Sequence, residues 1–378
     1  METLVTIERA LEIVRQTAVT LDTEWVPLSQ AYNRILSEDI ASKVDDPPFD
    51  NSAMDGWAVR SIDEQRVEVG TTAAGTAPLK VGVGEAIRIM TGAPMPDGAD
   101  AIVVIEDGLQ GKAHTNFIRR QGENLRKETV ALRMGQLLTP AAISMAATMG
   151  HATLPVRAKP RVAVISTGDE LITPGEELGV GAIYESNSYG LCALLEKIGC
   201  TPLLQETVVD SMGALRTTLD SLDCDVILTS GGVSMGEFDH VRKLMEQEGN
   251  IHFWKVAMRP GGPPLFGTWN GTPLFGLPGN PVSSHLVFMM IVAPWLSPEI
   301  PLANEVRVRM KDSVKGAPNK ICMRRIQIST QGEELVATTN THQGSGNIHS
   351  MVAHNGVTLL PPDTSAKPDD IIDALWFL

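Results

Sequence analysis

The sequence contains few aromatic residues, few cysteines and no excess of basic charge. Aromatic residues make up 4% of the 378 residues, and the four cysteines form no Cys-x-x-Cys pair. We therefore expect mainly aliphatic cores and reduced thiols in a cytoplasmic protein. Lysine and arginine total 31 against 45 aspartates and glutamates, a net charge of −14. Nonspecific binding to a nucleic-acid backbone needs a basic face, so no nucleic-acid partner is expected.

Long hydrophobic runs and metal-binding histidine patterns are also missing. The longest strongly apolar run, residues 286–296, is too short to cross a bilayer and contains Pro294. The N-terminus lacks the basic and apolar regions of a secretory signal, so we expect no membrane partner. The eight histidines form no His-x-x-His pattern, and the glycines form no Gly-x-Gly-x-x-Gly fingerprint. Neither a zinc site nor a Rossmann dinucleotide site is therefore expected.

Two segments with helical spacing flank a β-rich segment in the N-terminal half. Residues 7–16 place apolar side chains on one helical face, and residues 140–149 follow Thr139, which suits an N-cap. Between them, residues 57–118 show short β segments separated by glycine and proline. We predict that the two helices pack together in one discontinuous domain and that a β domain is inserted between them.

The C-terminal half changes character. Residues 161–293 alternate buried apolar runs with helical patterns, which predicts a doubly wound α/β domain. After Pro298 and Pro301, residues 305–310 alternate apolar and charged side chains, which predicts a half-exposed strand in a small all-β domain. The predicted domains are residues 1–44 with 124–157 (helical), 45–123 (inserted β), 158–299 (α/β) and 300–378 (C-terminal β).

Small and polar residues follow three strands of the predicted α/β sheet. Ligands bind outside the carboxyl ends of strands in such sheets, so these residues are candidates for one site. Glycine-rich loops before helices let backbone N–H groups approach an anion, which predicts a phosphate cradle. The alternative is that they are ordinary tight turns. The candidates are Ser166, Thr167, Gly168, Ser230, Gly231, Gly232, Ser234, Pro278, Gly279, Asn280 and Pro281.

Charged residues lie near these loops in the sequence. Lys255 and Arg259 could neutralise a phosphate or another oxyanion, or they could form a solvated surface pair. Carboxylates beside phosphate-binding loops usually imply a divalent cation such as Mg²⁺, although some could instead cap helices. The carboxylates concerned are Asp169, Glu170, Asp210, Glu237 and Asp239.

Two polar, tightly turned loops occur in the N-terminal half. They span residues 49–57 and 90–96, and they could carry Asp55 and Thr91 to a shared site. Their spacing alone does not identify a ligand.

Six motifs occur in an order that resembles the MoeA/gephyrin family of molybdopterin molybdenumtransferases. They are PPFDNSAMDGWAV (47–59), RIMTGAPMPDGADAIV (88–103), RRQGEN (119–124), ISTGDEL (165–171), TSGGVSMGEFD (229–239) and GLPGNPVS (276–283), with HQGS (342–345) near the end. The resemblance implies a MogA-like molybdopterin-binding α/β domain and a small C-terminal β-barrel.

The same resemblance implies a transferase of molybdenum cofactor synthesis. Such an enzyme takes adenylylated molybdopterin and molybdate, cleaves the pyrophosphate in a Mg²⁺-dependent step and releases AMP. It also implies a homodimer in which the α/β domain of one subunit and the inserted region of the other form the cleft. A molybdopterin adenylyltransferase upstream and molybdoenzyme apoproteins downstream are the expected partners.

Position within these motifs implies roles for individual residues. The catalytic candidates are Asp55, Thr91, Glu170, Asp239, Lys255 and Arg259. The metal candidates are Asp55, Glu170 and Asp239. Besides the loop residues listed above, Arg119, Asp210 and Ser345 are expected to bind the pterin substrate.

The chain departs from the family pattern at four positions, one of which is Lys320, which stands where arginine is usual. Asn124 replaces the final carboxylate of RRxGED, Gly262 replaces a frequent lysine in PGKP, and Arg259 stands where lysine is frequent. Asn124 and Gly262 favour one alternative, a non-catalytic molybdopterin-binding or scaffold paralogue. A second alternative is a pterin adenylyltransferase, against which the N-terminal motifs and the C-terminal β domain argue.

Overall fold

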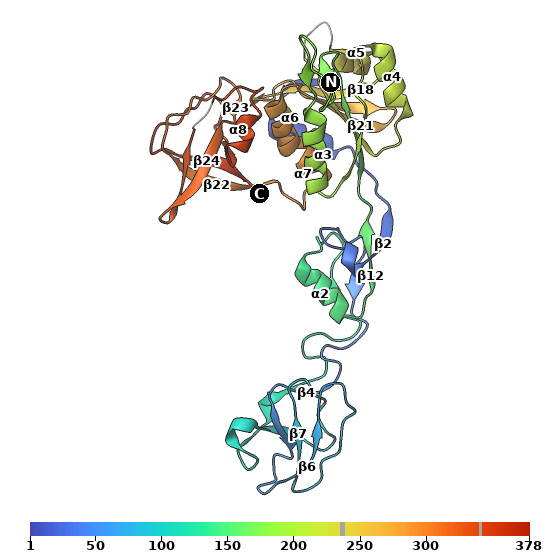
Figure 1. Cartoon of the computed structure of the whole chain (residues 1–378), viewed down its shortest axis with the longest axis vertical. Helices are drawn as coiled ribbons and strands as arrows, with labels where there is room; N and C mark the ends of the chain where they lie inside the picture. Colours follow the sequence, from blue (N-terminus) through green and yellow to red (C-terminus); the bar gives the residue numbers. More distant parts are fainter. Residues whose placement is uncertain (235–238, 340–341) are drawn as a thin grey trace. The chain divides into compact units, whose positions relative to one another are not determined.

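The computed structural model describes residues 1–234, 239–339 and 342–378 (Figure 1). The chain divides into two compact units. One, called here the α/β unit, comprises Met1–Leu21 and Lys159–Leu378; the other, the inserted unit, is Asp22–Ala158. Within the described ranges, no helix is both long enough and apolar enough to traverse a bilayer.

A seven-stranded mixed sheet forms the centre of the α/β unit. Its order is β1-β18-β20-β21-β17-β13-β16, and β20 runs antiparallel to both of its neighbours. Every residue of β17 is buried, as expected for a parallel strand covered on both faces. The bounds are Glu2–Val5 (β1), Arg161–Ser166 (β13), Thr201–Leu204 (β16), Val226–Ser230 (β17), Asn250–Val256 (β18), Leu265–Trp269 (β20) and Thr272–Leu277 (β21).

Helices cover both faces of this sheet (Figure 1). Val226 and Leu228 of β17 join α3 and α6 in one buried cluster, whereas Ile227 between them joins α4 and α5 in another. Alternate residues of a strand face opposite sides, so the two helix pairs pack on opposite faces. The bounds are Asn187–Lys197 (α3), Met212–Ser221 (α4), His240–Gln247 (α5), Pro281–Val287 (α6) and Ala293–Leu296 (α7), with a π-helical turn at Phe288–Val292.

The first helix packs on this sheet, and the predicted packing of the two N-terminal helices is wrong. The buried face of α1 (Ile7–Arg15) belongs to the same cluster as α3 and α6, whereas α2 (Pro140–Thr148) belongs to a cluster of the inserted unit. The reason is β1, which pairs in parallel with β18 and brings α1 to the sheet. Residues 1–21 therefore do not belong with residues 124–157.

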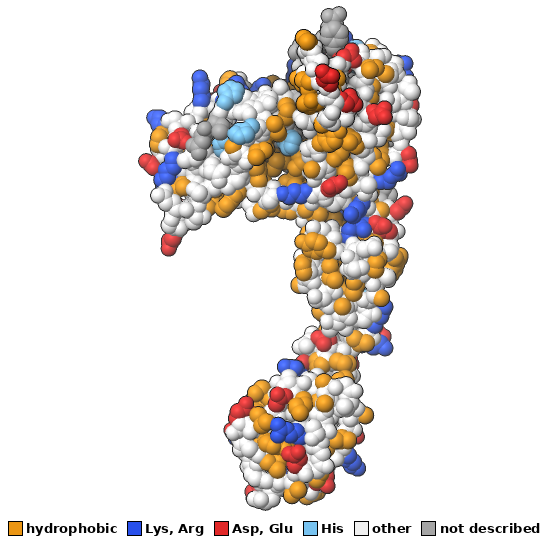
Figure 2. Space-filling view, viewed as in Figure 1, with side chains coloured by type: hydrophobic (Ala, Val, Ile, Leu, Met, Phe, Trp, Pro, Cys, Tyr) orange, Lys and Arg blue, Asp and Glu red, His pale blue; other side chains and the backbone are white. Residues whose placement is uncertain are grey.

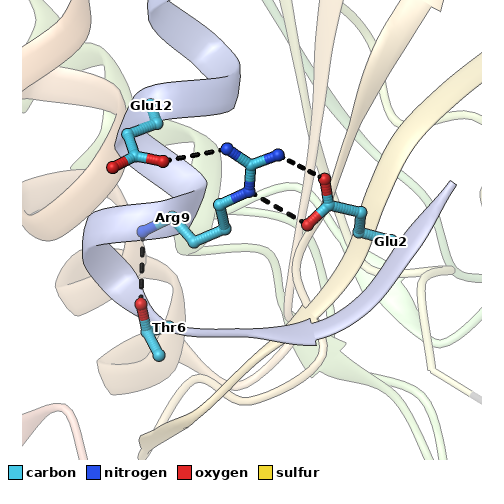
Figure 3. Close-up of polar contacts among 4 residues, drawn as sticks. All are labelled: Glu2, Thr6, Arg9 and Glu12. Carbon is cyan, nitrogen blue, oxygen red and sulfur yellow. Dashed lines mark hydrogen bonds and ion pairs between the residues drawn. The ribbon is translucent and has the colours of Figure 1, made fainter.

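Polar contacts tie β1 to α1 (Figure 3). Thr6 caps the helix by accepting a hydrogen bond from the Arg9 N–H at 3.2 Å. The Arg9 guanidinium donates to Glu2 at 2.6 and 3.1 Å and to Glu12 at 2.9 Å. These side chains are exposed, so the ion pairs set the geometry of the strand–helix junction more than its stability.

A closed five-stranded barrel follows the α/β domain within the same unit. Its order is β22-β25-β24-β26-β27. The barrel is joined to the α/β domain by a parallel pair of short strands, β19 (Met258–Arg259) and β23 (Ile321–Cys322). The barrel strands are Ala303–Met310 (β22), Arg325–Gln331 (β24), Glu334–Thr338 (β25), Gly356–Thr358 (β26) and Ile371–Phe377 (β27), and α8 is His349–Val352.

The inserted unit combines a small α/β part with a β domain. Strand β2 (Thr23–Pro27) pairs with β12 (Thr153–Arg157), and α2 packs beside them. Figure 2 shows acidic and basic side chains interspersed over the visible face of the β domain. Its five-stranded sheet has the order β6 (Val67–Thr72), β7 (Glu85–Ile89), β5 (Gly56–Val59), β8 (Ala101–Val104) and β9 (Ala113–His114), with β4 (Asn51–Ser52) and β10 (Ile118–Arg119) paired beside it.

The predicted fold class is confirmed: a doubly wound α/β domain, an inserted β domain and a small C-terminal barrel are all present. All four cysteines lie in the described ranges and are free thiols. Apart from the N-terminal correction, the predicted domain boundaries remain predictions.

Candidate functional site

The carboxyl ends of β13, β17 and β21 meet at one edge of the sheet, where a cavity of about 520 Å³ opens. We call it the loop cavity. The three loops singled out in the sequence converge on it, so the parallel topology places them as expected. The sequence-predicted residues that line it are Ser166, Thr167, Gly168, Glu170, Asp210, Ser230, Gly231, Gly232, Ser234, Asp239, Pro278, Gly279, Asn280 and Pro281.

Backbone hydrogen bonds join the three loops. The Thr167 N–H donates to the Ser230 carbonyl at 3.2 Å, and the Gly231 N–H donates to the Leu277 carbonyl at 3.0 Å. Gly231 has φ of +97°, and a Cβ there would lie 3.0 Å from the Thr167 carbonyl oxygen. Both the backbone angle and the close approach therefore require glycine.

Asn187, at the start of α3, lines the same cavity and was missed in the sequence. Its Nδ2 donates to Ser230 Oγ at 2.8 Å and to the Gly279 carbonyl at 2.7 Å. A carbonyl only accepts, so the Gly279 contact fixes which way the amide points. Asn187 thus links two loops whose residues are far apart in the chain.

Glu185 is a second residue that the sequence did not reveal. It is 5% exposed, and its Oε1 accepts hydrogen bonds from Ser166 Oγ and from the Ser188 N–H, both at 2.8 Å. A buried carboxylate needs such donors. Glu185 therefore fixes the Ser166 hydroxyl at the cavity wall.

Carboxylates gather at one side of the loop cavity. Burial raises the pKa of Asp210, and the neighbouring charges of Asp169 and Glu170 raise it further. The Asp210 N–H donates to Asp169 Oδ1 at 2.9 Å, which keeps the two residues together. Glu237 lies outside the described residues. Among the residues that are described, no group of three or more His, Cys, Asp or Glu side chains could hold a metal ion.

A second cavity, of about 820 Å³, lies between the α/β domain and the barrel. We call it the basic cavity. Lys255, Arg259 and Ser345 line it, as does Lys320 from the barrel. Arg324 also lines it and was not predicted from the sequence. Pro263 and Asn280 line both cavities, so the two adjoin.

Lys320 offsets the missing lysine at position 262. A Cβ on Gly262 would lie 3.6 Å from Lys320 Nζ. The ammonium group of the barrel thus lies close to the point from which a side chain at position 262 would extend. The basic cavity keeps a positive charge at this point although Gly262 contributes none.

Arg325 supports one wall of the basic cavity from inside the barrel. Its side chain is fully buried and donates to the Gly344 carbonyl and to Ser350 Oγ, both at 3.0 Å. Burial, aided by the nearby Arg324 charge, lowers the pKa of Arg325 to about 10. Ser345 is held by α6 of the α/β domain, because the Val282 N–H donates to the Ser345 carbonyl at 3.1 Å.

Three predicted site residues lie in the inserted unit. Thr91 donates to Asp55 Oδ1 through its N–H at 2.7 Å and its hydroxyl at 3.0 Å, so the structure brings the two loops together. These hydrogen bonds, aided by Arg88, lower the pKa of Asp55. Arg119 is exposed on β10, which pairs with β4 just before the Asp55 loop. Asp55 and Thr91 are thus in contact within the inserted unit, Arg119 lies on a strand pair of the same unit, and the roles of all three stay predictions.

Asn124 contacts a carboxylate in the inserted unit. Its Nδ2 donates to Asp46 Oδ2 at 3.1 Å, and its backbone N–H donates to the Asp46 carbonyl at 3.0 Å. An amide suits this position because it can donate to an acid, which an ionised aspartate cannot do.

Known proteins match most of the chain. Residues 5–150 match the MoeA N-terminal region (domain I and II), and residues 163–298 match a probable molybdopterin binding domain. The molybdopterin molybdenumtransferase of Bacillus subtilis (strain 168) is 34% identical over 377 residues, covering 91% of this chain and 87% of the relative. That of Haemophilus influenzae is 37% identical over 316 residues, covering 78% and 77%.

The fold agrees with these matches. The crystal structure of the molybdopterin biosynthesis moeA protein from Pyrococcus horikoshii OT3 superposes with a TM-score of 0.83 at 30% identity, covering 99% of this chain and 100% of that one. Sequence and fold therefore agree over nearly the full length. The chain belongs to the molybdopterin molybdenumtransferase family.

Proposed function

We propose that this chain inserts molybdenum from molybdate into adenylylated molybdopterin and releases AMP. The observation that carries this proposal is the pair of adjoining cavities. The loop cavity offers glycine-rich loops and carboxylates, and the basic cavity offers four cationic side chains. A substrate with phosphates and an oxyanion cosubstrate need these two environments side by side.

Each cavity has its own task in this proposal. Backbone N–H groups of the loop cavity bind the phosphates of the pterin substrate, as glycine-rich loops do in other phosphate sites. Lys255, Arg259, Lys320 and Arg324 of the basic cavity hold molybdate, whose two negative charges they neutralise. Holding both substrates in neighbouring cavities lowers the entropic cost of their reaction.

Mg²⁺ fits the carboxylate side of the loop cavity. Mg²⁺ is usually bound by one or two carboxylates together with substrate phosphates and water. Glu170, Asp210 and Asp239 line the cavity. Burial, followed by the charges of Asp169 and Glu170, raises the pKa of Asp210, and a cation would offset those charges. When bound, Mg²⁺ would neutralise charge on the cleaved pyrophosphate.

AMP release tests the proposal. The purified chain is incubated with adenylylated molybdopterin and Mg²⁺, with and without molybdate, and AMP is measured. Molybdate-dependent release supports insertion. The matched variants are Asp210→Asn, expected to lose activity, and Asp223→Asn, an exposed aspartate paired with Arg161 away from both cavities, expected to keep it.

A non-catalytic molybdopterin-binding scaffold is the second candidate, favoured by Asn124. Tight pterin binding without AMP release would support it and refute insertion. Pterin adenylylation from ATP, measured in parallel, would indicate the third candidate.

The proposed partners follow from the family resemblance. We propose a homodimer in which Asp55, Thr91 and Arg119 complete the site of a second copy. Mixing inactive Asp55→Asn and Asp239→Asn chains tests this. Recovery of AMP release up to about a quarter of the wild-type rate, the share of intact sites in a random mixture of dimers, supports it. No recovery would contradict it.

A further inference from the structure

Trp254 does not line either cavity, but it contacts one lining residue of each. Its side chain is 9% exposed and lies on β18. Its indole N–H donates to the Val233 carbonyl at 3.0 Å, and Val233 lines the loop cavity. Its ring centroid lies 4.0 Å from Lys255 Nζ, and Lys255 lines the basic cavity. One buried side chain therefore contacts an element of each cavity.

The indole N–H sets the direction of a peptide group. The Gly232 carbonyl accepts from the Arg242 N–H at 3.0 Å, and the next carbonyl, that of Val233, accepts from Trp254. In a trans peptide the N–H points opposite to the carbonyl. The N–H groups of Val233 and Ser234 are therefore turned away from these two donors. Neither donates to a backbone carbonyl among the described residues, and both residues line the loop cavity.

The backbone next to Trp254 turns the Lys255 side chain toward it. Successive side chains of a regular strand point to opposite faces, so Lys255 would normally point away from Trp254. Lys255 instead has φ of +70°, and Leu4, opposite it on β1, has φ of +55°. The positive φ values at these two positions make the strands irregular here, and the Lys255 ammonium can therefore lie over the indole ring. A cation is attracted to the face of tryptophan more strongly than to that of phenylalanine.

We propose that Trp254 is a positioning residue for both anion sites: its N–H orients the Ser234 amide toward a phosphate, and its ring holds the Lys255 ammonium toward an oxyanion. The nature of these anions rests on the proposed function. The placement of the Ser234 amide and of the ammonium rests on the contacts above.

Two substitutions separate the two tasks. Trp254→Phe removes the N–H donor and keeps an aromatic ring, whereas Trp254→Leu removes both. Trp269→Phe is the matched control, because Trp269 is also buried in the same apolar cluster and donates to Asp220 at 2.9 Å, away from both cavities. Calorimetric titration of the full chain with pyrophosphate and with molybdate measures the two sites. Hydrogen exchange of residues 229–234 measures the loop directly.

The expected pattern is selective. Trp254→Phe weakens pyrophosphate binding about fivefold, the effect of one hydrogen bond, and leaves molybdate binding within about twofold of wild type. Trp254→Leu also weakens molybdate binding, about threefold. Exchange of residues 229–234 becomes faster in both variants and not in Trp269→Phe.

Two results would overturn the proposal. One is unchanged pyrophosphate binding and unchanged exchange in Trp254→Phe. The other is an equal loss for both probes in all three variants, which would indicate general loosening of the core. If wild type binds neither probe, the proposed function fails, and the exchange measurement still decides whether Trp254 positions the loop.

Discussion

Replacing Asn124 by aspartate restores the carboxylate that the family motif has at this position, and the surrounding contacts allow its cost to be worked out. The new oxygen would take the place of Nδ2, which lies 3.1 Å from Asp46 Oδ2. The backbone cannot relax easily, because the N–H groups of residues 124 and 125 both donate to the Asp46 carbonyl. Two like charges about 4 Å apart in water repel by about 1 kcal/mol, so we expect a loss of about 1 kcal/mol in the free energy of unfolding.

This loss depends on pH and on divalent cations. The repulsion requires both carboxylates to be ionised, so acid removes it once either one is protonated. Mg²⁺ binds between two carboxylates and therefore stabilises the folded variant. A loss of about 1 kcal/mol corresponds to a fall of about 3 °C in melting temperature for a unit of this size.

Scanning calorimetry of wild type, Asn124→Asp and Asn124→Ala at pH 7 and pH 4, with and without Mg²⁺, tests this reasoning. Asn124→Ala loses the hydrogen bond without adding charge, so its deficit should not respond to pH or Mg²⁺. An Asn124→Asp chain as stable as wild type at pH 7, and indifferent to Mg²⁺, would refute the electrostatic account. A rise in its AMP release would show that the amide weakens catalysis.

Three further predictions concern the α/β unit. Gly231→Ala should weaken pyrophosphate binding about tenfold in calorimetric titration, because a positive φ costs alanine about 1–2 kcal/mol and the added Cβ would meet a carbonyl oxygen. Gly175→Ala, which has a similar φ but open space around its Cβ, should bind pyrophosphate as wild type does. Equal binding by the two variants would contradict this prediction. Asp210→Asn should raise the urea midpoint of unfolding at pH 7 and not at pH 3. The pKa of Asp210 is raised in the folded chain, so its carboxyl group stabilises the fold at low pH, and this contribution is lost as the pH rises above the pKa that Asp210 has in the unfolded chain. A lower midpoint in the variant at pH 7 would oppose this prediction. Burial lowers the pKa of His285, so the stability of wild type should fall as the pH drops below about 6.5. The stability of His285→Gln should fall less, as measured by urea unfolding at pH 7 and pH 5. An equal fall in both chains would count against this prediction.

The loop cavity could be predicted from the sequence because its geometry is local to strand ends. The apolar runs at residues 161–166 and 225–230 mark buried parallel strands, and parallel strands end at the same edge. The small residues that follow each run therefore lie together at that edge of the sheet. No contact across the fold was needed to reach this conclusion.

The rest of the site depends on contacts between distant segments. Glu185 and Asn187 follow the short strand β15 (Ile183–Tyr184), which no sequence pattern indicates. Asn187 is the first residue of α3, and Glu185 lies two residues before it. Lys320 and Arg324 enter the basic cavity because β19 pairs with β23. Such pairing between short strands leaves no periodic signal in the sequence.

The N-terminal error has a similar physical cause. The four residues of β1 are too few to show a strand pattern, and their partner β18 lies some 250 residues later in the chain. The apolar face of α1 was identified correctly, but a helical pattern does not reveal which surface covers it.

The boundary of the inserted unit bears on how the chain folds during synthesis. The Ala158 N–H donates to the Asp22 carbonyl at 2.7 Å, so the unit's two ends lie side by side. Asp22–Ala158 can therefore close on itself while the ribosome is still producing the strands that follow. β1 and α1 emerge before this unit but must wait for β18 before their apolar faces are covered. These residues are thus made before the inserted unit but fold after it, and they stay open to proteases and chaperones in the meantime.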